Sequence, residues 1–264
     1  MRFGSIASGS SGNSLYLNAG DASFLIDAGI SCKRIVEGIT GFGRYPSEID
    51  AIFITHEHTD HISGLPVFMK KYHIPLYATE KTLDEILKAP GGSSIDPEDL
   101  YVIAPERPFT IKGVDITPYR ISHDAADPVG YTFSYEGRKI GIATDIGVYD
   151  EQTVKSLQDC SLLYVEANHD LTMLQVGPYP YHLKRRIAGD RGHLSNENCA
   201  KLVCDVMNSD LRHVILGHLS KENNFPDVAL STVKCDICMK LGSSDLPFTL
   251  DVAPRSSMSA LYTI

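Results

Sequence analysis

The sequence lacks any long hydrophobic run. No stretch approaches the ~18 apolar residues that a membrane-spanning helix needs. The first residues, Met1 to Ser5, also show no basic segment followed by an apolar one, which a secretory signal would require. We therefore expect a cytoplasmic chain with no membrane partner. Its 264 residues, 43% hydrophobic and 22% charged, have the composition of an ordinary globular protein.

Cysteine and positive charge are also limited. The six cysteines are scattered, which fits a reducing compartment better than a disulfide framework. Cys235 and Cys238 lie one helical turn apart with no second pair, so we favour helix packing over a metal or redox site. The 24 lysines and arginines face 33 acids, for a net charge of −9. This excludes non-specific nucleic-acid binding over the whole surface but leaves a local basic patch open.

Proline-rich linkers are absent as well. The segment from Pro90 to Pro97 indicates a loop and not a domain boundary. We therefore predict a single domain over residues 1–264.

The most informative segment that is present is a dense histidine cluster. His56, His58, Asp60 and His61 follow the apolar run Ala51 to Ile54, which predicts a short buried strand. Imidazole nitrogens and a carboxylate at the end of a strand are ligands for Zn²⁺ or Mn²⁺. The alternative, solvated loop histidines, rarely gives such density. The protease motif His-Glu-x-x-His is excluded because Asp60 stands four residues after His56, so we expect a strand-to-loop turn.

Two hairpins echo each other along the chain. Residues 15–20 lead through a turn into 22–29, and residues 131–137 lead into 139–147. In both hairpins the second strand ends in an aspartate, Asp27 or Asp145, with a glycine two residues later. This pattern predicts an internally duplicated sandwich with its site at one edge.

Helical periodicity appears between and after these hairpins. We expect four helices, over residues 63–72, 82–88, 196–207 and 231–241, the third with Asn196 or Ser195 as its N-cap. Further candidate ligands follow other apolar runs: His123, Asp145 and His218. Because open sheets collect functional groups at strand ends, these residues and the histidine cluster together predict one site.

The full motif set resembles the metallo-β-lactamase superfamily, over residues 3 to 220. The resemblance implies an α/β fold, the four-layer αββα sandwich, and two divalent metal ions, Zn or Mn. One metal would be held by His56, His58 and His123. The other would be held by Asp60, His61 and His218, with Asp145 bridging both and Asp27 orienting a ligand histidine.

This ligand set implies hydrolysis. Two divalent ions ~3.5–4 Å apart lower the pKa of a shared water and stabilise charge on the attacked oxygen. An aspartate bridge, Asp145, favours hard oxygen substrates such as phosphoesters and tolerates Mn²⁺ as well as Zn²⁺.

The segments that contain Glu166 and His193 resemble those of the ribonuclease Z and phosphodiesterase branch. In that branch a glutamate after a strand pairs with a histidine just before a helix. By that resemblance His193 would donate a proton to the leaving oxygen and Glu166 would hold its imidazole. With Asp60 these residues form the expected catalytic set. The structural alternative for His193 is packing at a helix start.

Two further segments are candidate substrate contacts. The loop Ala7 to Ser14, with Ser10, Ser11 and Asn13, would turn backbone N–H groups toward an anion, or it would only form a tight hairpin. The basic segment Lys184, Arg185 and Arg186 would contact a phosphate backbone, or it would be a solvated helix face.

The combined pattern of these motifs is similar to the bacterial YycJ family, also called WalJ or VicX. The resemblance implies a 5′–3′ exonuclease on double-stranded DNA, related to DNA repair and encoded beside a two-component system. The chain lacks the β-CASP and flexible-arm insertions of RNA-processing relatives. Two alternatives stay open: a hydrolase of a small phosphodiester, thioester or lactone, and a regulatory binding protein.

Overall fold

Both predicted hairpins are present. In the first, β2 (Ser14–Ala19) runs antiparallel to β3 (Ala22–Ile26), and in the second, β9 (Val129–Tyr135) runs antiparallel to β10 (Arg138–Ala143). Their turns contain Gly20 at φ 56° and Gly137 at φ 74°, a left-handed conformation that glycine adopts without strain.

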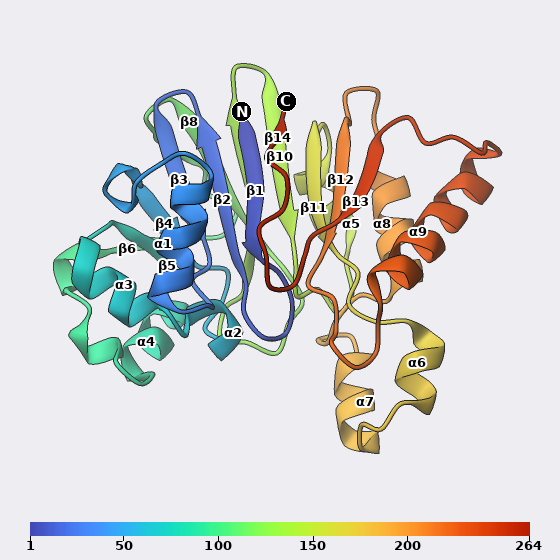
Figure 1. Cartoon of the computed structure of the whole chain (residues 1–264), viewed down its shortest axis with the longest axis horizontal. Helices are drawn as coiled ribbons and strands as arrows, with labels where there is room; N and C mark the ends of the chain where they lie inside the picture. The colour runs from blue at the N-terminus through green and yellow to red at the C-terminus, as the bar shows by residue number, and fades with distance from the viewer. The chain divides into compact units, whose positions relative to one another are not determined.

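A computed structural model describes residues 1–264, which divide into two compact units by their contacts (Figure 1). Unit 1 comprises Met1–Arg120, Ala125–Val129 and Pro254–Thr263. Unit 2 comprises Ile121–Asp124, Gly130–Ala253 and Ile264. The single domain over residues 1–264 stays a prediction.

Unit 1 contains a seven-stranded sheet with the order β14-β1-β2-β3-β4-β5-β6. Its strands β1, β2 and β3 are antiparallel neighbours, whereas β3 to β6 are parallel. The remaining strands of this sheet are β1 (Arg2–Ala7), β4 (Ala51–Phe53), β5 (Leu76–Thr79), β6 (Leu100–Ile103) and β14 (Tyr262–Thr263). This unit also contains the antiparallel strands β7 (Phe109–Ile111) and β8 (Val114–Arg120), which belong to the second seven-stranded sheet, of order β13-β12-β11-β10-β9-β8-β7.

The helices of unit 1 pack against its sheet and form one apolar core with it. They are α1 (Cys32–Gly41), α2 (Thr59–Ile62), α3 (Leu65–Tyr72) and α4 (Glu80–Lys88), with 3₁₀ turns η1 (Pro46–Glu48), η2 (Gly92–Ser94) and η3 (Pro97–Asp99). Ile35 of α1 and Phe68 of α3 are fully buried together with Tyr16, Leu25 and Ile52 of the strands. Burial of such large side chains is the main stabilising term of the unit, ~1.5–3 kcal/mol for each.

Unit 2 repeats the same succession of strands. From β9 the order runs β10, β11 (Leu162–Glu166), β12 (His213–Gly217) and β13 (Thr249–Val252). The β9–β10 pair is antiparallel, and β10 to β13 are parallel. Both units therefore pass from an antiparallel hairpin into parallel strands, which confirms the predicted internal duplication.

Five helices belong to unit 2. They are α5 (Glu151–Leu157), α6 (Leu171–Val176), α7 (Tyr181–Ile187), α8 (Asn196–Val206) and α9 (Pro226–Leu241). Figure 1 shows α6 and α7 beyond the strand ends of this unit, away from α8 and α9. None of the helices in the chain combines the length and the apolar sequence that crossing a membrane requires.

All four predicted helices are present, three of them with nearly the expected bounds. Helix α8 has Ser195 as its N-cap, and the Ser195 hydroxyl accepts a hydrogen bond from the Asn198 N–H at 3.2 Å. Helix α9 starts at Pro226, five residues before the predicted Ser231, because proline at the first turn is compatible with a helix start. Cys235 and Cys238 lie on α9 with free thiols; Cys235 is exposed and Cys238 is partly buried, so the predicted packing role is not met at Cys235.

One glycine of unit 1 permits a close backbone approach next to the histidine cluster. A Cβ at Gly29 would clash with the backbone carbonyl of Asp60, because the two backbones lie within van der Waals contact. Backbone atoms cannot swing away as a side-chain tip can, so any larger residue must displace the Asp60 segment.

Gly29→Ala is therefore expected to destabilise the protein by ~3 kcal/mol or more, at or beyond the usual range for overpacking. Gly43→Ala is the control, since open space surrounds Gly43 and only its positive φ of 80° adds strain, about 1 kcal/mol. Urea unfolding followed by circular dichroism measures both. Equal losses in the free energy of unfolding for the two variants would show that the Asp60 backbone does not restrict the size of the side chain at position 29.

Candidate functional site

The histidine cluster lies where the sequence predicts it, directly after β4 of unit 1. His56 and His58 lie in the loop after β4, as expected. Asp60 and His61 belong to the one-turn helix α2, which the predicted strand-to-loop turn lacked. The His56 ring centroid lies 4.6 Å from that of His58 and 4.1 Å from that of His61. The three imidazoles therefore form one compact group at the end of a buried strand.

Asp27 fixes the orientation of this group. Its Oδ2 accepts a hydrogen bond from His61 Nδ1 at 2.7 Å, and its Oδ1 accepts from the Thr55 backbone N–H at 2.9 Å. Both Asp27 and His61 are buried. An ionised carboxylate only accepts, so Nδ1 of His61 carries the proton and Nε2 keeps its lone pair. The hydrogen bond is the one that the resemblance implied for Asp27, and the role of His61 as a metal ligand stays a prediction.

Thr55 extends the same arrangement to His56. The Thr55 hydroxyl lies 3.0 Å from Asp27 Oδ2 and 3.0 Å from His56 Nδ1. The hydroxyl donates its single hydrogen to the carboxylate and accepts from His56 Nδ1, so His56 Nε2 also keeps its lone pair. Thr55 stands at the strand end immediately before His56, but the sequence alone predicts no role for it.

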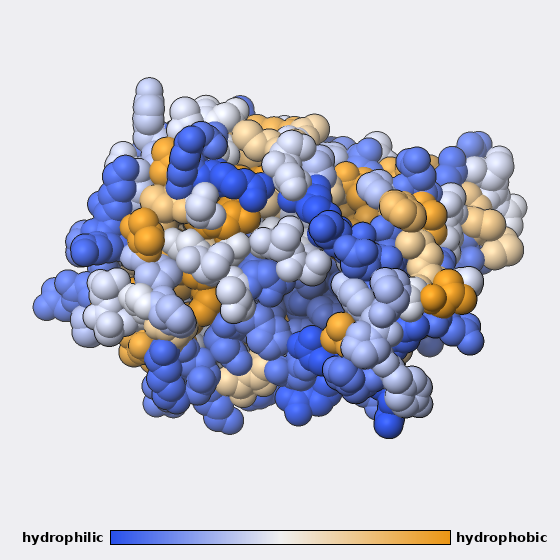
Figure 2. All heavy atoms as spheres, turned by 60° about the horizontal axis from the view of Figure 1, so that its bottom comes forward, coloured by the Kyte–Doolittle hydropathy of each residue, from blue (hydrophilic) through white to orange (hydrophobic).

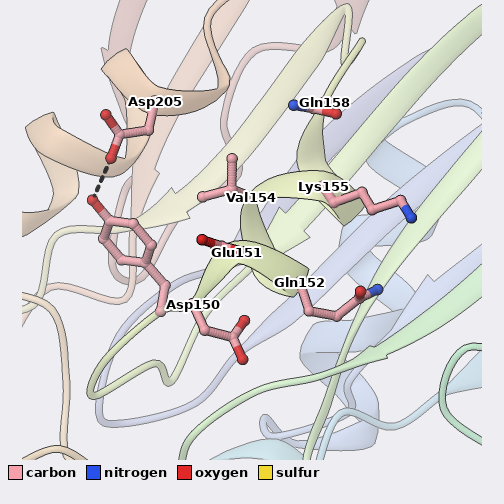
Figure 3. A pocket seen from close by; sticks show the side chains of 8 residues that line it. Asp150, Glu151, Gln152, Val154, Lys155, Gln158 and Asp205 are labelled. Atoms are coloured by element: carbon pink, nitrogen blue, oxygen red, sulfur yellow. Dashed lines mark hydrogen bonds between the residues drawn. The ribbon is translucent and has the colours of Figure 1, made fainter.

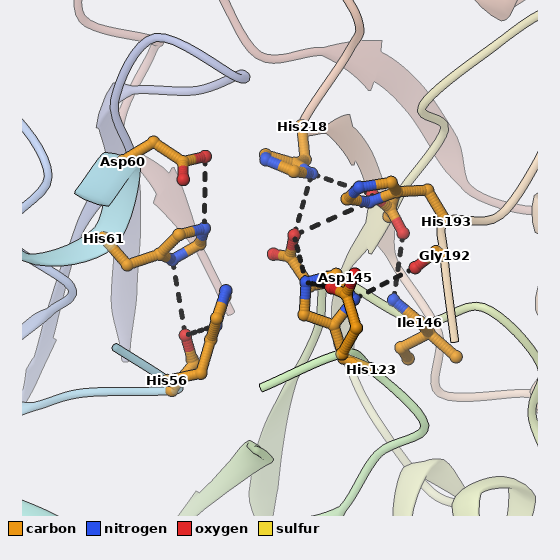
Figure 4. A network of polar contacts seen from close by, with 12 residues as sticks. His56, Asp60, His61, His123, Asp145, Ile146, Gly192, His193 and His218 are labelled. Carbon is orange, nitrogen blue, oxygen red and sulfur yellow. Dashed lines mark hydrogen bonds and ion pairs between the residues drawn. The ribbon is translucent and has the colours of Figure 1, made fainter. Parts of the chain in front are cut away.

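Glu166, the last residue of β11, orients two histidines in unit 2, His193 and His218, which are labelled in Figure 4. Its Oε1 accepts from His193 Nδ1 at 2.7 Å and from His218 Nδ1 at 2.8 Å. Its Oε2 accepts from the backbone N–H groups of Ile146 at 3.0 Å and Leu194 at 3.2 Å. The predicted Glu166–His193 contact is therefore present, and the contact with His218 is an addition.

The charge of Glu166 is secured by these partners. Burial alone raises the pKa of this fully buried carboxyl, but the neighbouring His193 and His218 outweigh burial and hold the pKa below its ordinary value. Glu166 is therefore ionised at neutral pH, and both imidazoles present Nε2 on the side away from it.

His123 and Asp145 complete the unit 2 group. His123 Nδ1 donates to the Gly192 carbonyl at 3.1 Å, which again leaves Nε2 with its lone pair. Asp145 Oδ1 lies 3.7 Å from His123 Nε2 and 3.4 Å from His218 Nδ1. Asp145, Glu166, His193 and His218 each offer an atom within 4.8 Å of the others, close enough for a metal ion.

Three of these residues hold a strained backbone conformation. Asp27, Asp145 and His218 have φ values of 59°, 58° and 53°, a left-handed region that costs a residue with a Cβ ~1–2 kcal/mol. Each follows the end of a strand, and Asn168 Nδ2 donates to the His218 carbonyl at 3.0 Å, which helps to hold that turn. Strain kept in place by such bonds is typical of functional sites.

The donor set of each unit fits a divalent cation. Four imidazoles donate Nδ1–H to a carboxylate or carbonyl oxygen, those of His61, His123, His193 and His218. The His56 imidazole donates its Nδ1–H to the Thr55 hydroxyl, which in turn donates to Asp27. Neutral Nε2 atoms beside the Asp60 and Asp145 carboxylates are the ligand types that Zn²⁺ and Mn²⁺ share.

The loop between β1 and β2 places one of its three candidate substrate contacts, Asn13, inside the protein. Asn13 is buried; its Oδ1 accepts from the Gly9 N–H at 2.8 Å, and its Nδ2 lies 3.1 Å from His61 Nε2 and 3.3 Å from Asp60 Oδ2. The loop does form a hairpin between antiparallel strands. Ser10 and Ser11 are exposed at its tip. Contact of Ser10 and Ser11 with substrate stays a prediction. Asn13 is buried against His61 and Asp60, and its contact with substrate also stays a prediction.

The basic segment lies on α7, and its three side chains have different partners. Arg186 makes a two-point ion pair with Asp124, and Lys184 Nζ donates to the Gln175 carbonyl at 2.8 Å. Arg185 lies over the Tyr181 ring, 5.9 Å from its centroid. Substrate contact by this segment stays a prediction, and Arg186 has a structural partner of its own.

His169 lies three residues after Glu166, and the sequence predicts no chemical role for it. It is buried, and its Nδ1 has no hydrogen-bond partner. Burial lowers the pKa of His169 to about 4, against the opposing charge of Glu166. His169 is therefore neutral at physiological pH.

Another hollow of unit 2 does not include these groups. It has a volume of ≈ 890 Å³ and is lined by α5 residues together with Tyr149 and Asp205 (Figure 3). The Tyr149 hydroxyl donates to Asp205 at 2.9 Å, and Lys240 pairs with the same carboxylate. With no histidine or cysteine in its lining, this hollow is a weaker candidate than the histidine clusters.

Comparison with known proteins places the chain among related sequences. Residues 23–219 match the β-lactamase superfamily domain. The chain is 37% identical to exodeoxyribonuclease WalJ of Streptococcus pneumoniae serotype 2 over 233 residues, which cover 88% of this chain and 87% of that one. It is 34% identical to exodeoxyribonuclease YycJ of Bacillus anthracis, with 88% of each chain covered.

A solved structure supports the fold in the same way. The metallo-β-lactamase fold protein YhfI of Bacillus subtilis matches 98% of this chain and 99% of its own, with a TM-score of 0.72 at 15% identity. At that identity the likeness shows the fold alone. It confirms the predicted αββα metallo-β-lactamase sandwich.

The buried neutral His169 makes stability depend on pH. Because its folded pKa of about 4 lies below the usual value of 6.5, the unfolded chain binds more protons between those pH values. Stability is therefore full above about pH 6.5 and falls as the pH drops toward about 4. This group alone contributes a loss of roughly 2 kcal/mol between pH 7 and pH 5.

His169→Gln removes this titration and is expected to flatten the pH dependence by that amount. Urea unfolding at the two pH values measures it, with exposed His73→Gln as the matched control. Identical pH slopes for the wild type and His169→Gln would contradict a neutral, buried His169.

Proposed function

The chain belongs to the metallo-β-lactamase superfamily and, within it, to the family of the WalJ and YycJ exodeoxyribonucleases, and from this we propose that it is a metal-dependent phosphodiesterase that removes nucleotides from double-stranded DNA in the 5′–3′ direction. A metal-dependent hydrolase follows from the family. The double-stranded substrate, the polarity and two metal ions are the specific parts of the proposal.

The observation that supports it most is the common orientation of the histidines. His61, His123, His193 and His218 each have Nδ1 bonded to a carboxylate or carbonyl oxygen. Packing histidines have no reason to share one tautomer, whereas metal-binding histidines do. A regulatory protein with a vestigial site would not need to keep this arrangement.

Seven residues are proposed to hold the two ions: His56, His58, Asp60, His61, His123, Asp145 and His218. When bound, the ions lower the pKa of a water and offset the charge that develops on the phosphate. The part of Asp27, Thr55 and Glu166 is to keep the imidazoles in the ligating tautomer before any ion arrives.

His193 is proposed as the proton donor. Its side chain is 12% exposed, whereas those of His218 and His123 are 2% and 0% exposed, so His193 is the accessible imidazole of the three. In its protonated form it gives the Nε2 proton to the departing oxygen and becomes the neutral Nδ1–H tautomer that Glu166 already binds. General-acid help of this kind contributes ~10²–10⁴ in rate.

DNA fits the chemistry of the donor set. Hard carboxylate ligands such as Asp60 and Asp145 suit ions that bind phosphate oxygens. A DNA substrate also agrees with the proposed location in the cytoplasm and with the basic residues of α7.

A gel assay tests the function. Double-stranded DNA labelled at the 5′ end, or separately at the 3′ end, is incubated with chelated protein and with Mn²⁺ or Zn²⁺ added back. Release of the 5′ label as short products, with gradual shortening of the 3′-labelled strand, is the expected result. Asp60→Ala should abolish it, while Asp21→Ala, at an exposed turn position, should not.

Other results select the alternatives. Cleavage of a chromogenic small phosphodiester without any attack on DNA would favour a small-molecule hydrolase. Bound metal with neither activity would favour a regulatory role. Loss of the 3′ label first would reverse the proposed polarity.

His58 and His193 should separate metal binding from proton transfer. His58→Ala is expected to lose metal and activity together. His193→Ala should keep its metal and lose ~10²–10⁴ in kcat. Metal analysis by mass spectrometry and initial rates on DNA measure both, with exposed His73→Ala as control. Loss of metal in His193→Ala would make His193 a ligand, and full activity would remove its assigned role.

A further inference from the structure

The segment between Glu166 and His193 carries two helices that no part of the proposed chemistry uses. It leaves β11 after Glu166 and forms α6 and α7 (Figure 1). At its far end the His193 N–H donates to the Ile187 carbonyl at 2.9 Å, which joins α7 to the proposed proton donor. At its near end the Asp170 side chain caps α6 and its N–H donates to the Asn223 carbonyl.

A groove of ≈ 380 Å³ lies between these two helices. Leu171, Leu174 and Tyr181 give it an apolar lining, and Lys184 and Arg185 contribute its charged side. Lys184 Nζ donates to the Gln175 carbonyl at 2.8 Å, so α7 is tied to α6 across the groove. The groove therefore has a defined width and is not a gap between loose helices.

The apolar side of the groove is open to solvent. Tyr181 is 75% exposed and Leu171 is 50% exposed, whereas Leu174 beneath them is 4% exposed. An aromatic ring and an aliphatic side chain in these positions present a flat surface on which a planar group can stack. Leaving both uncovered has no structural benefit.

The charge around the groove is of one sign. Residues 171–188 contain Lys184, Arg185 and Arg186 but no aspartate or glutamate, in a chain of net charge −9. Asp124 neutralises Arg186, while Lys184 bonds a carbonyl and Arg185 lies over the Tyr181 ring. Two positive charges are therefore left beside the stacking surface.

We propose that the α6–α7 groove binds an unpaired nucleotide of the DNA substrate, with its base stacked on Tyr181 and its phosphate bound by Lys184 and Arg185. Stacking on aromatic side chains beside basic residues is the usual way in which proteins hold single-stranded nucleic acid without sequence preference. An exonuclease must separate the terminal nucleotide from its partner strand, so an unpaired nucleotide is present next to the reaction. The inference rests on the proposed nuclease function.

A nucleic-acid occupant fits better than a protein partner. The face drawn in Figure 2 is mostly hydrophilic, with hydrophobic side chains in small separate patches and no continuous apolar surface. Stable protein interfaces bury ~1,200–2,000 Å² with an apolar centre, whereas a single nucleotide needs only a small stacking surface and a positive charge.

Fluorescence anisotropy of the full chain, with a chelator present to prevent cleavage, tests this. Two labelled probes are compared: a blunt duplex and the same duplex with a single-stranded overhang. Tyr181→Ala should weaken binding of the overhang probe at least about fivefold, the lower end for the loss of one stacked base. It should leave the blunt probe unchanged, and Tyr181→Phe should retain tight binding.

Arg185→Ala should weaken the overhang probe and lower the slope of log affinity against log salt by about 0.7, the value for one phosphate contact on a single strand. Arg212→Ala, at an exposed position at the start of β12, is the charge-matched control. Val176→Ala is the control for an exposed apolar residue of α6 outside the groove lining.

The outcomes separate this inference from the proposed function. If the wild type degrades DNA with metal but Tyr181→Ala binds the overhang as the wild type does, the groove assignment is wrong and the nuclease stands. If the wild type neither degrades nor binds DNA, both fail. If Tyr181→Ala instead converts a dimer to a monomer in sedimentation without altering DNA binding, the groove is a self-interface and the inference is overturned.

Discussion

Hydrogen bonds from imidazole Nδ1 to buried acceptors are the interaction on which the proposed chemistry depends. Asp27 and Glu166 are both buried, and each receives a histidine Nδ1–H at 2.7 Å. A buried carboxylate without partners would be costly, so the histidines stabilise the acids while the acids select the histidine tautomer. The acids and the histidines therefore stabilise one another, and each Nε2 atom keeps the lone pair with which it would bind a metal ion.

The duplicated fold explains how one chain supplies two such arrangements. In each unit an antiparallel hairpin passes into parallel strands, and the second hairpin strand ends in an aspartate with positive φ, Asp27 or Asp145. The two aspartates differ in the bonds that they make. Asp27 accepts from His61 of α2, whereas in unit 2 the equivalent bonds go to Glu166 and leave Asp145 as a candidate bridging ligand. The same backbone arrangement therefore holds an orienting acid, Asp27, and the acid that we propose as a metal ligand, Asp145.

Much of this arrangement could be predicted from the sequence, because its signals are local. The two hairpins, the helices and the histidines at strand ends depend on short-range periodicity and turn chemistry. The Glu166–His193 pair was predicted only through a family resemblance, because 27 residues and two helices separate them. The second bond, from His218 to Glu166, spans 52 residues and had no sequence signal.

Other features required the three-dimensional structure for the same reason. The neutralisation of Arg186 by Asp124 joins residues 62 apart, so the basic segment is less uniformly available than its sequence suggests. Asn13 has the sequence pattern of an exposed loop residue, whereas its amide contacts His61 and Asp60 in the interior. Left-handed φ at His218 was not foreseen either, since histidine gives no warning of it as glycine does.

We infer that buried acceptors hold the site histidines in the Nδ1–H tautomer before metal binds. Long-range ¹H–¹⁵N correlation spectra of the metal-free protein at mildly alkaline pH report the tautomer of each histidine directly. We expect Nδ1–H tautomers at His61, His123, His193 and His218, while His182, exposed on α7, shows the usual solvent mixture. Nε2–H tautomers at His61 and His218 would contradict it, because neither imidazole could then bond its carboxylate and ligate a metal at once.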